Sequence, residues 1–181
     1  MPSWSAHAPP MTPFRHDDPR FRLRPIEVDD RGALAEILAE PEVARWWVHE
    51  DVVTAVADLY DDADEVRLVI EVGSEVAGLI QYSEENEPDY RHAGIDLFLA
   101  TEWQGRGIGP DAIRIVARHL FEEHGHHRLT IDPAVANERA IRAYEKVGFR
   151  RVGVMRRYER GSDGVSHDGL LMDLLRDELQ S

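Results

Sequence analysis

The spacing of hydrophobic residues predicts three strands and two helices in the first half of the chain. Strand-like alternation covers 21–24, 66–72 and 76–82, and helical spacing covers 34–38 and 52–60. Asp29 or Asp30 suits the cap of the first helix, and Pro41 suits its end. Gly73 and Ser74 separate the two later strands, which indicates a hairpin.

The middle of the chain has the order strand, helix, strand. The segment 84–92 is charged and carries a proline, so we expect a loop there, followed by a strand over 94–100. Apolar residues then recur at helical spacing, at Ile113, Val116, Ala117, Leu120 and Phe121. Pro110 suits the first turn of this helix and Gly125 its end, and 128–132 supplies the next strand. This order predicts a right-handed parallel crossover.

A further helix and a final strand pair complete the pattern. Asn137 can cap this helix, and Gly148 suits its end. The inward positions of the helix are Ala140, Ile141, Tyr144 and Val147. Residues 149–158 and 168–175 supply the last two strands, with turn-forming residues between them.

Composition indicates one globular domain preceded by a tail. The chain has 181 residues and is 43% hydrophobic, which is enough for one sizeable core. Residues 1–20 hold five prolines among mainly polar residues, so we expect a flexible tail there and a single domain over 21–181. No pattern in the sequence sets an oligomeric state.

Cysteine content and charge limit the classes of function. The chain has no cysteine, which excludes disulfides, thiolate metal sites and a cysteine nucleophile, and we expect a cytoplasmic protein. No apolar run approaches the roughly 20 residues that span a bilayer, and the N-terminus lacks a secretory pattern, so we expect neither export nor a membrane anchor. The formal net charge of -14 disfavours nucleic acid and anionic lipid and would attract a polycation, although acidity also serves solubility.

A glycine-rich turn lies between the strand at 94–100 and the helix after it. Its sequence is Gln104-Gly105-Arg106-Gly107-Ile108-Gly109. Glycines let successive backbone N–H groups point into one concavity, and the helix start adds partial positive charge, so the turn can hold a pyrophosphate. Arg106 can add a mobile cation, and a plain strand-to-helix turn is the alternative. A dinucleotide fingerprint would need glycine at Pro110, and a P-loop would need lysine after the last glycine, so both are excluded.

Two blocks of sequence together resemble the GNAT superfamily of N-acetyltransferases. The acetyl-CoA motif of that family, Q/R-x-x-G-x-G/A, matches Gln104, Gly107 and Gly109, and the block 137–149 is similar to a second family motif. The resemblance implies a mixed, mostly antiparallel central sheet with one parallel strand pair joined by a helix, and helices on both faces. It implies acetyl-CoA as co-substrate, with Leu99, Gln104, Gly105, Arg106, Gly107, Ile108, Gly109, Asn137 and Tyr144 on the cofactor side.

Within that superfamily the chain is similar to aminoglycoside 6'-N-acetyltransferases. The shared segments are Trp46-Trp47, Gly94-Ile95-Asp96, Asp132-Pro133 and 140–146. The resemblance implies direct transfer of an acetyl group to a primary amine on a small cationic acceptor, without a covalent enzyme intermediate. Siderophore-pathway lysine N-acyltransferases share part of the pattern. A siderophore lysine, a protein N-terminus and a CoA-binding module without catalysis therefore stay as alternatives.

Three polar side chains are candidates for the chemistry. Asp96 lies in an otherwise apolar strand, where it is either an exposed carboxylate or, as the resemblance implies, the group that binds the amine and accepts its proton. Asp132 ends the next strand and either caps a loop or binds the acceptor. Tyr144 either packs in the core or, as the resemblance implies, places its hydroxyl near the departing sulfur.

Two tryptophans and three histidines are further candidates for binding. Trp46 and Trp47 can form a wall of the acceptor pocket or anchor a helix end. The histidines His124, His126 and His127 lie in a helix-to-strand turn without a nearby carboxylate pattern. We therefore expect a solvated turn there and no metal.

Overall fold

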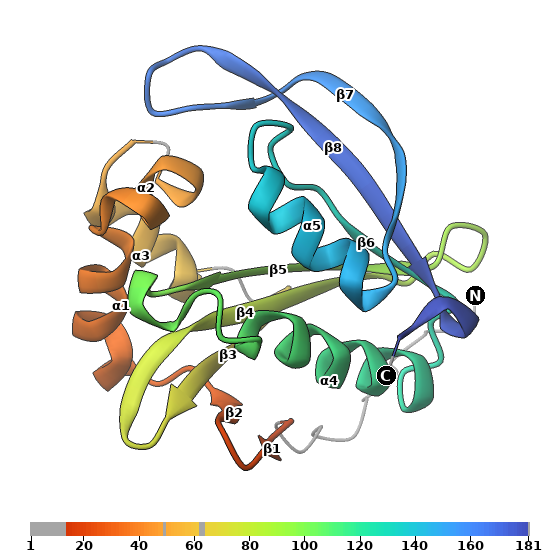
Figure 1. Cartoon of the computed structure of the whole chain (residues 1–181), viewed down its shortest axis with the longest axis horizontal. Coiled ribbons are helices and arrows are strands. Elements are labelled where there is room, and N and C mark those ends of the chain that lie inside the picture. The colour runs from red at the N-terminus through yellow and green to blue at the C-terminus, as the bar shows by residue number, and fades with distance from the viewer. Residues whose placement is uncertain (1–13, 49, 62–63, 181) are drawn as a thin grey trace, which may run out of the picture.

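In the computed structural model, the described residues 14–48, 50–61 and 64–180 form one eight-stranded sheet with helices on both faces (Figure 1). The strands are β1 (His16–Asp17), β2 (Arg22–Pro25), β3 (Glu65–Val72), β4 (Glu75–Glu85), β5 (His92–Leu99), β6 (Arg128–Ile131), β7 (Arg150–Arg160) and β8 (Ser166–Leu175). The α-helices are α1 (Arg31–Leu38), α2 (Pro41–Trp47), α3 (Val52–Asp61), α4 (Ile108–Glu122) and α5 (Glu138–Val147). Short 3-10 helices span Val28–Asp30, Thr101–Trp103 and Arg176–Glu178. The strand order is β1-β2-β3-β4-β5-β6-β8-β7.

The parallel pair predicted from the sequence is β5 and β6, which α4 joins. The other neighbouring pairs of the described sheet are antiparallel, so the expected fold class is confirmed. The two parallel strands share the partner pairs Ala93 with Leu129 and Gly94 with Thr130. Beyond these pairs β5 continues without β6 beside it, and this divergence leaves room for a cleft.

Helix α4 packs on one face of the sheet because its apolar residues form one stripe. Ile113, Val116 and Leu120 each have 0% exposure. Burial of each of these side chains contributes roughly 1.5–3 kcal/mol. Gly125 follows the helix with φ of 71°, in the left-handed region that favours glycine, as the sequence predicts.

Helices α1, α2 and α3 cover the other face around a second apolar cluster. Leu34 of α1 and Leu59 of α3 pack there with Leu79 of β4 and Phe98 of β5. Pro41, which we expected to end the first helix, instead begins α2, and two residues separate it from the end of α1. Proline fits the first turn of a helix because its missing N–H has no intrahelical partner at that position.

Residues 14–20, which we expected to belong to a flexible tail, join the fold. Strand β1 pairs with β2, and Phe14 stacks on His119 of α4 with ring centroids 4.0 Å apart. Arg20 donates a hydrogen bond to Asp111 of α4 at 2.6 Å. One aromatic contact and one ion pair therefore attach this segment to α4, and neither is visible in its proline-rich composition. Residues 1–13 lie outside the described residues.

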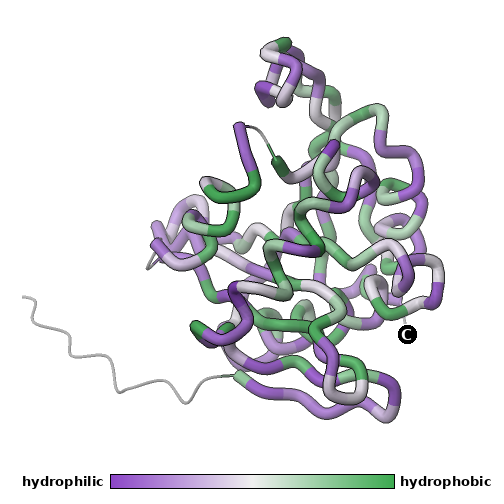
Figure 2. Tube along the Cα trace, turned by 90° about the vertical axis from the view of Figure 1, so that its left-hand side faces the viewer, coloured by the Kyte–Doolittle hydropathy of each residue, from purple (hydrophilic) through white to green (hydrophobic). Residues whose placement is uncertain are grey.

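The predicted hairpins are present, with strands longer than expected. Gly73 forms the turn between β3 and β4 with φ of 63°, and β7 and β8 make the final pair. Strand β4 extends to Glu85 and β5 begins at His92, so the loop between them is shorter than the expected 84–92. Hydrophobic and hydrophilic residues alternate in short stretches along the trace (Figure 2). Of the helices in the described part of the chain, none is long and apolar enough to cross a bilayer.

Candidate active site

A cleft of about 740 Å³ lies where β5 continues past its pairing with β6. Its walls come from β5, the glycine-rich turn, the start of α4, the segment after β6, and helices α2 and α5. The predicted site residues that line it are Trp46, Trp47, Asp96, Leu99, Gln104, Gly105, Gly107, Gly109, Asp132, Asn137 and Tyr144. The fold thus brings together candidates that are far apart in the sequence.

The glycine-rich turn has the backbone conformation that a phosphate cradle needs. Gly105 and Gly107 have φ of 75° and 83°, in the region where other residues are strained. Gly107 is the N-cap of α4 and makes no side-chain cap, so the first N–H groups of the helix are not covered by a capping side chain. A Cβ added at Gly105 would have no atom within 4 Å, so the space beside the turn is open. An open, uncapped helix start fits the pyrophosphate of a CoA ligand.

Gln104 connects the turn to the elements on either side. Its Nε2 donates to the backbone carbonyl of Leu99 at the end of β5, at 2.7 Å. Its Oε1 accepts a hydrogen bond from Arg139 of α5. The side chain therefore fixes the turn between β5 and α5. Sequence reasoning missed Arg139, because its partner is 35 residues away.

Two residues of the predicted cradle do not line the cleft. The guanidinium of Arg106 donates to the backbone carbonyl of Glu102 at 2.8 Å and lies 4.8 Å from the ring centroid of Trp103, so it turns away from the described cleft. The side chain of Ile108 is 4% exposed and packs in the core, which leaves its backbone as the part that faces the turn. The basic residues of the lining are instead Arg114, Arg139, Arg142 and Lys146.

Helix α5 carries Tyr144 into the cleft from a well-defined start. The side chain of Asn137 caps the helix by accepting a hydrogen bond from the backbone N–H of Ala140 at 3.2 Å, as the sequence predicts. Tyr144 is 7% exposed and lines the cleft. Burial, followed by the negative charges of Asp96 and Asp132, raises the pKa of Tyr144 far above its ordinary value. The hydroxyl therefore stays protonated and can donate a hydrogen bond.

Asp96 is the most strongly perturbed carboxylate of the cleft. It lies on β5 opposite Gln81 of β4, and its Oδ1 accepts from the backbone N–H of Leu97 at 2.9 Å. Water in the open cleft reaches the side chain, yet the surrounding protein removes much of its hydration. This burial, with the charge of Asp132 as the second cause, raises the pKa of Asp96 to about 8. A carboxylate with such a pKa accepts a proton more readily than an ordinary aspartate.

Asp132 follows β6 and is held by a residue that sequence reasoning missed. The hydroxyl of Tyr158 on β7 donates to Oδ2 of Asp132 at 2.6 Å. This hydrogen bond, together with burial, raises the pKa of Tyr158 to about 12. Tyr158 and Glu159 both line the cleft. The β7 strand could not be assigned to the site from sequence, because its approach to Asp132 depends on the twist of the final hairpin.

The two tryptophans on α2 have different environments. Trp47 makes an edge contact with Phe98, with ring centroids 4.8 Å apart, and packs against the second apolar cluster. Trp46 lies against the guanidinium of Arg45, 4.6 Å from its ring centroid. Both tryptophans line the cleft. Trp47 in addition anchors α2 on the second apolar cluster, whereas Trp46 forms part of the cleft wall.

The histidine turn differs from the expectation. His126 is 2% exposed, and both His124 and His126 contact the carboxylate of Glu84 from β4. The prediction of a solvated turn is therefore wrong for these two residues. The carboxylate that the local sequence lacks comes from 40 residues upstream. His127 remains exposed.

A family model and two related proteins all match this chain to acetyltransferases. Residues 20–150 match the model of the acetyltransferase (GNAT) domain. The chain is 31% identical over 134 residues to spermidine N(1)-acetyltransferase of Escherichia coli (strain K12), and this alignment covers 71% of this chain and 72% of that protein. It is 30% identical over 153 residues to aminoglycoside N(6')-acetyltransferase type 1 of Klebsiella pneumoniae, covering 74% and 75% of the two chains.

A solved structure agrees with the sequence relatives. Mycobacterium smegmatis RimJ in complex with CoA-disulfide superposes with a TM-score of 0.76 at 25% identity, covering 89% of this chain and 84% of that one. The family match spans most of the chain and contains the glycine-rich turn and Asp96 of β5. The chain therefore belongs to the GNAT acetyltransferase family and is an N-acetyltransferase that uses acetyl-CoA as its co-substrate.

Proposed function

We propose that the acceptor is the 6'-amino group of an aminoglycoside, a small molecule that carries several ammonium groups. The observation that carries this proposal is the pair of carboxylates, Asp96 and Asp132, in one cleft. They interact strongly enough for the charge of Asp132 to raise the pKa of Asp96. Such a pair favours a ligand with more than one positive charge. Trp46 adds an aromatic surface suited to a sugar ring.

The residues of the cleft can promote direct transfer. Bound acetyl-CoA supplies a thioester, whose carbonyl carbon forms a bond to the acceptor nitrogen while its bond to sulfur breaks. Asp96 binds the ammonium and takes one proton from the nitrogen, directly or through water, and the second proton that the nitrogen loses passes through water to the departing thiolate. Tyr144 donates a hydrogen bond toward the departing sulfur. Because the pKa of this tyrosine is raised, its contribution is a hydrogen bond rather than full proton transfer.

A linear polyamine is the second candidate acceptor. A relative at 31% identity is a spermidine N(1)-acetyltransferase. A second hollow, of about 510 Å³, shares Asp96, Asp132 and Tyr158 with the cleft and adds the carboxylates of Glu65 and Glu85. An acidic surface that extends beyond the reacting amine suits a chain of several ammonium groups.

A panel of amines tests the proposal by release of free CoA thiol. The panel holds an aminoglycoside with a 6'-amino group, its counterpart with a 6'-hydroxyl group, spermidine, lysine and a peptide with a free N-terminus. We expect the highest kcat/KM with the 6'-amino aminoglycoside and acetylation at that nitrogen by mass spectrometry. Equal rates with the 6'-hydroxyl counterpart would exclude the 6'-position, and a higher kcat/KM with spermidine would favour the polyamine.

A further inference from the structure

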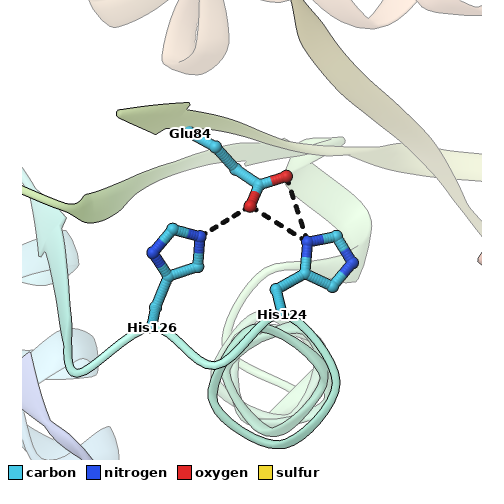
Figure 3. A group of neighbouring side chains, drawn as sticks. All are labelled: Glu84, His124 and His126. Carbon is cyan, nitrogen blue, oxygen red and sulfur yellow. Dashed lines mark hydrogen bonds and ion pairs between the residues drawn. The ribbon is translucent and has the colours of Figure 1, made fainter. Parts of the chain in front are cut away.

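Three side chains outside the acyl-transfer cleft converge on one point (Figure 3). Glu84 projects from β4 toward His124 and His126, which lie in the loop between α4 and β6. Nδ1 of His124 lies 3.0 Å from each carboxylate oxygen of Glu84, and Nε2 of His126 lies 2.6 Å from its Oε2. Two imidazoles therefore share one carboxylate.

The cluster is shielded from bulk water. The side chains of His126, His124 and Glu84 are 0%, 9% and 22% exposed. The carboxylate of Glu84 therefore lies between two imidazole nitrogens in a largely buried setting.

The three groups have the geometry of a metal-ligand set. Their ligand atoms, one from each side chain, all lie within 4.8 Å of one another. A tetrahedral Zn²⁺ with bonds of about 2.0–2.1 Å holds its ligand atoms about 3.3 Å apart. Small rotations of the three side chains would reach that spacing. Two imidazoles and one carboxylate form a known zinc ligand set that leaves a fourth position for water.

Hydrogen bonding alone leaves this region incompletely satisfied. Among the described residues, Nδ1 of buried His126 has no hydrogen-bond partner, and neither has Nε2 of the neighbouring His119. The His119 ring lies 4.5 Å from that of His124, measured between centroids. Buried nitrogens without a partner are rare in folded proteins, and many of them contact a bound ion or a water molecule. These two nitrogens are not the atoms that face Glu84, so they mark an unusually polar buried region beside the cluster and are not part of its ligand set.

Glu84 lies on the opposite face of the sheet from Asp96. Tyr82 of β4 packs in the core under α4, and by alternation Glu84 shares its face. Gln81 lies on the other face, where it is the register partner of Asp96. The loop that carries the histidines leads directly into β6, which Asp132 follows. Arg91 also holds this loop, by donating to the backbone carbonyl of His124 at 2.6 Å.

We propose that Glu84, His124 and His126 form a Zn²⁺ site that fastens the loop before β6 to β4. Imidazole nitrogens favour Zn²⁺ and its neighbours in the transition series, whereas Mg²⁺ and Ca²⁺ require oxygen ligands. The ion has a structural role, because it lies away from the cleft and holds the strand that delivers Asp132. This site is additional to the acyl-transfer machinery and does not depend on which amine is the acceptor.

Zinc binding to the full chain tests the proposal. Protein prepared without a polyhistidine tag and treated with a chelator is titrated with Zn²⁺ by calorimetry, and Co²⁺ replaces Zn²⁺ to give a visible absorption spectrum. We expect one equivalent of tightly bound Zn²⁺. At a hundredfold excess over Kd, the Tm should rise by roughly 5–10 °C. Mg²⁺ at the same concentration should leave the Tm unchanged.

Matched variants assign the ligands. Glu84→Gln and His126→Gln should each weaken Zn²⁺ binding by at least about 100-fold, more than the loss of an outer hydrogen bond would. Glu85→Gln and His127→Gln change exposed neighbours of the same types and should bind Zn²⁺ as the wild type does. If His126→Gln does not fold, the nearly isosteric Glu84→Gln decides. A wild-type Tm unaffected by Zn²⁺, or equal losses in the control variants, would overturn the site.

Discussion

Replacing Asp96 by asparagine separates the charge of this side chain from its shape. The pKa of Asp96 is about 8, so roughly a tenth of the free enzyme carries the ionised carboxylate at pH 7 and about nine tenths at pH 9. If that carboxylate binds the ammonium and accepts its proton, kcat/KM for the acceptor should rise about tenfold between these pH values and level off above pH 8. An acceptor whose amine pKa lies well above 9 keeps its own charge over this range.

The asparagine variant should follow a different pH profile. Without the carboxylate only free amine reacts, so the rate should rise about tenfold per pH unit with no plateau near 8. At pH 7 we expect a loss of at least about tenfold in turnover, which shrinks above pH 8 because the wild type has reached its plateau. Acetyl-CoA affinity should be unchanged, since the glycine-rich turn is intact.

Steady-state kinetics across pH and a calorimetric titration of acetyl-CoA together measure these effects. Asp132→Asn is an informative companion, because it removes a charge that raises the pKa of Asp96 and should shift the plateau to lower pH. Asp89→Asn changes an exposed loop carboxylate and should leave the profile as in the wild type. Identical pH profiles for Asp96→Asn and the wild type, or an equal loss of acetyl-CoA affinity, would refute the role given to Asp96.

Four further outcomes follow from the structure. Tyr144→Phe should keep acetyl-CoA affinity and lower turnover by roughly 10- to 1000-fold; unchanged turnover would leave it a packing residue. Gly109→Ala should weaken acetyl-CoA binding at least about tenfold by calorimetry, because a side chain here hinders the approach of the ligand to the turn. Helical circular dichroism should be kept, because the added Cβ meets Leu99 at an ordinary 3.5 Å, and Gly32→Ala on open surface should bind normally. Leu120→Ala should lower the free energy of unfolding by about 2–5 kcal/mol in denaturant titrations, since this side chain is fully buried. Because the pKa of Asp96 is raised, the folded state binds the proton of this carboxyl more tightly than the unfolded state does. The Tm of the wild type should therefore fall relative to that of Asp96→Asn as the pH rises from about 4 to 8.

The local elements of the fold were determined by the sequence, because each depends on residues close together in the chain. The stripe from Ile113 to Leu120 predicts α4, and Asn137 and Gly148 mark the two ends of α5 as the structure has them. The glycine-rich turn was predictable for the same reason, since its positive φ values need glycine at those positions. One exception is Pro41, where one residue is compatible with both the end of one helix and the start of another.

The partners of the functional side chains were decided by the tertiary structure. Tyr158 reaches Asp132 across 26 residues, and Glu84 reaches His126 across 42. These contacts depend on strand register and on the twist of the sheet, which accumulate over several strands and leave no local periodicity. Arg106 is an example of a contact that the sequence suggests and the tertiary structure does not make. Its position in the motif suggests a phosphate contact, but its guanidinium packs against the Trp103 ring instead. Spacing along the chain fixes which face a side chain takes, and only the assembled sheet fixes what it meets there.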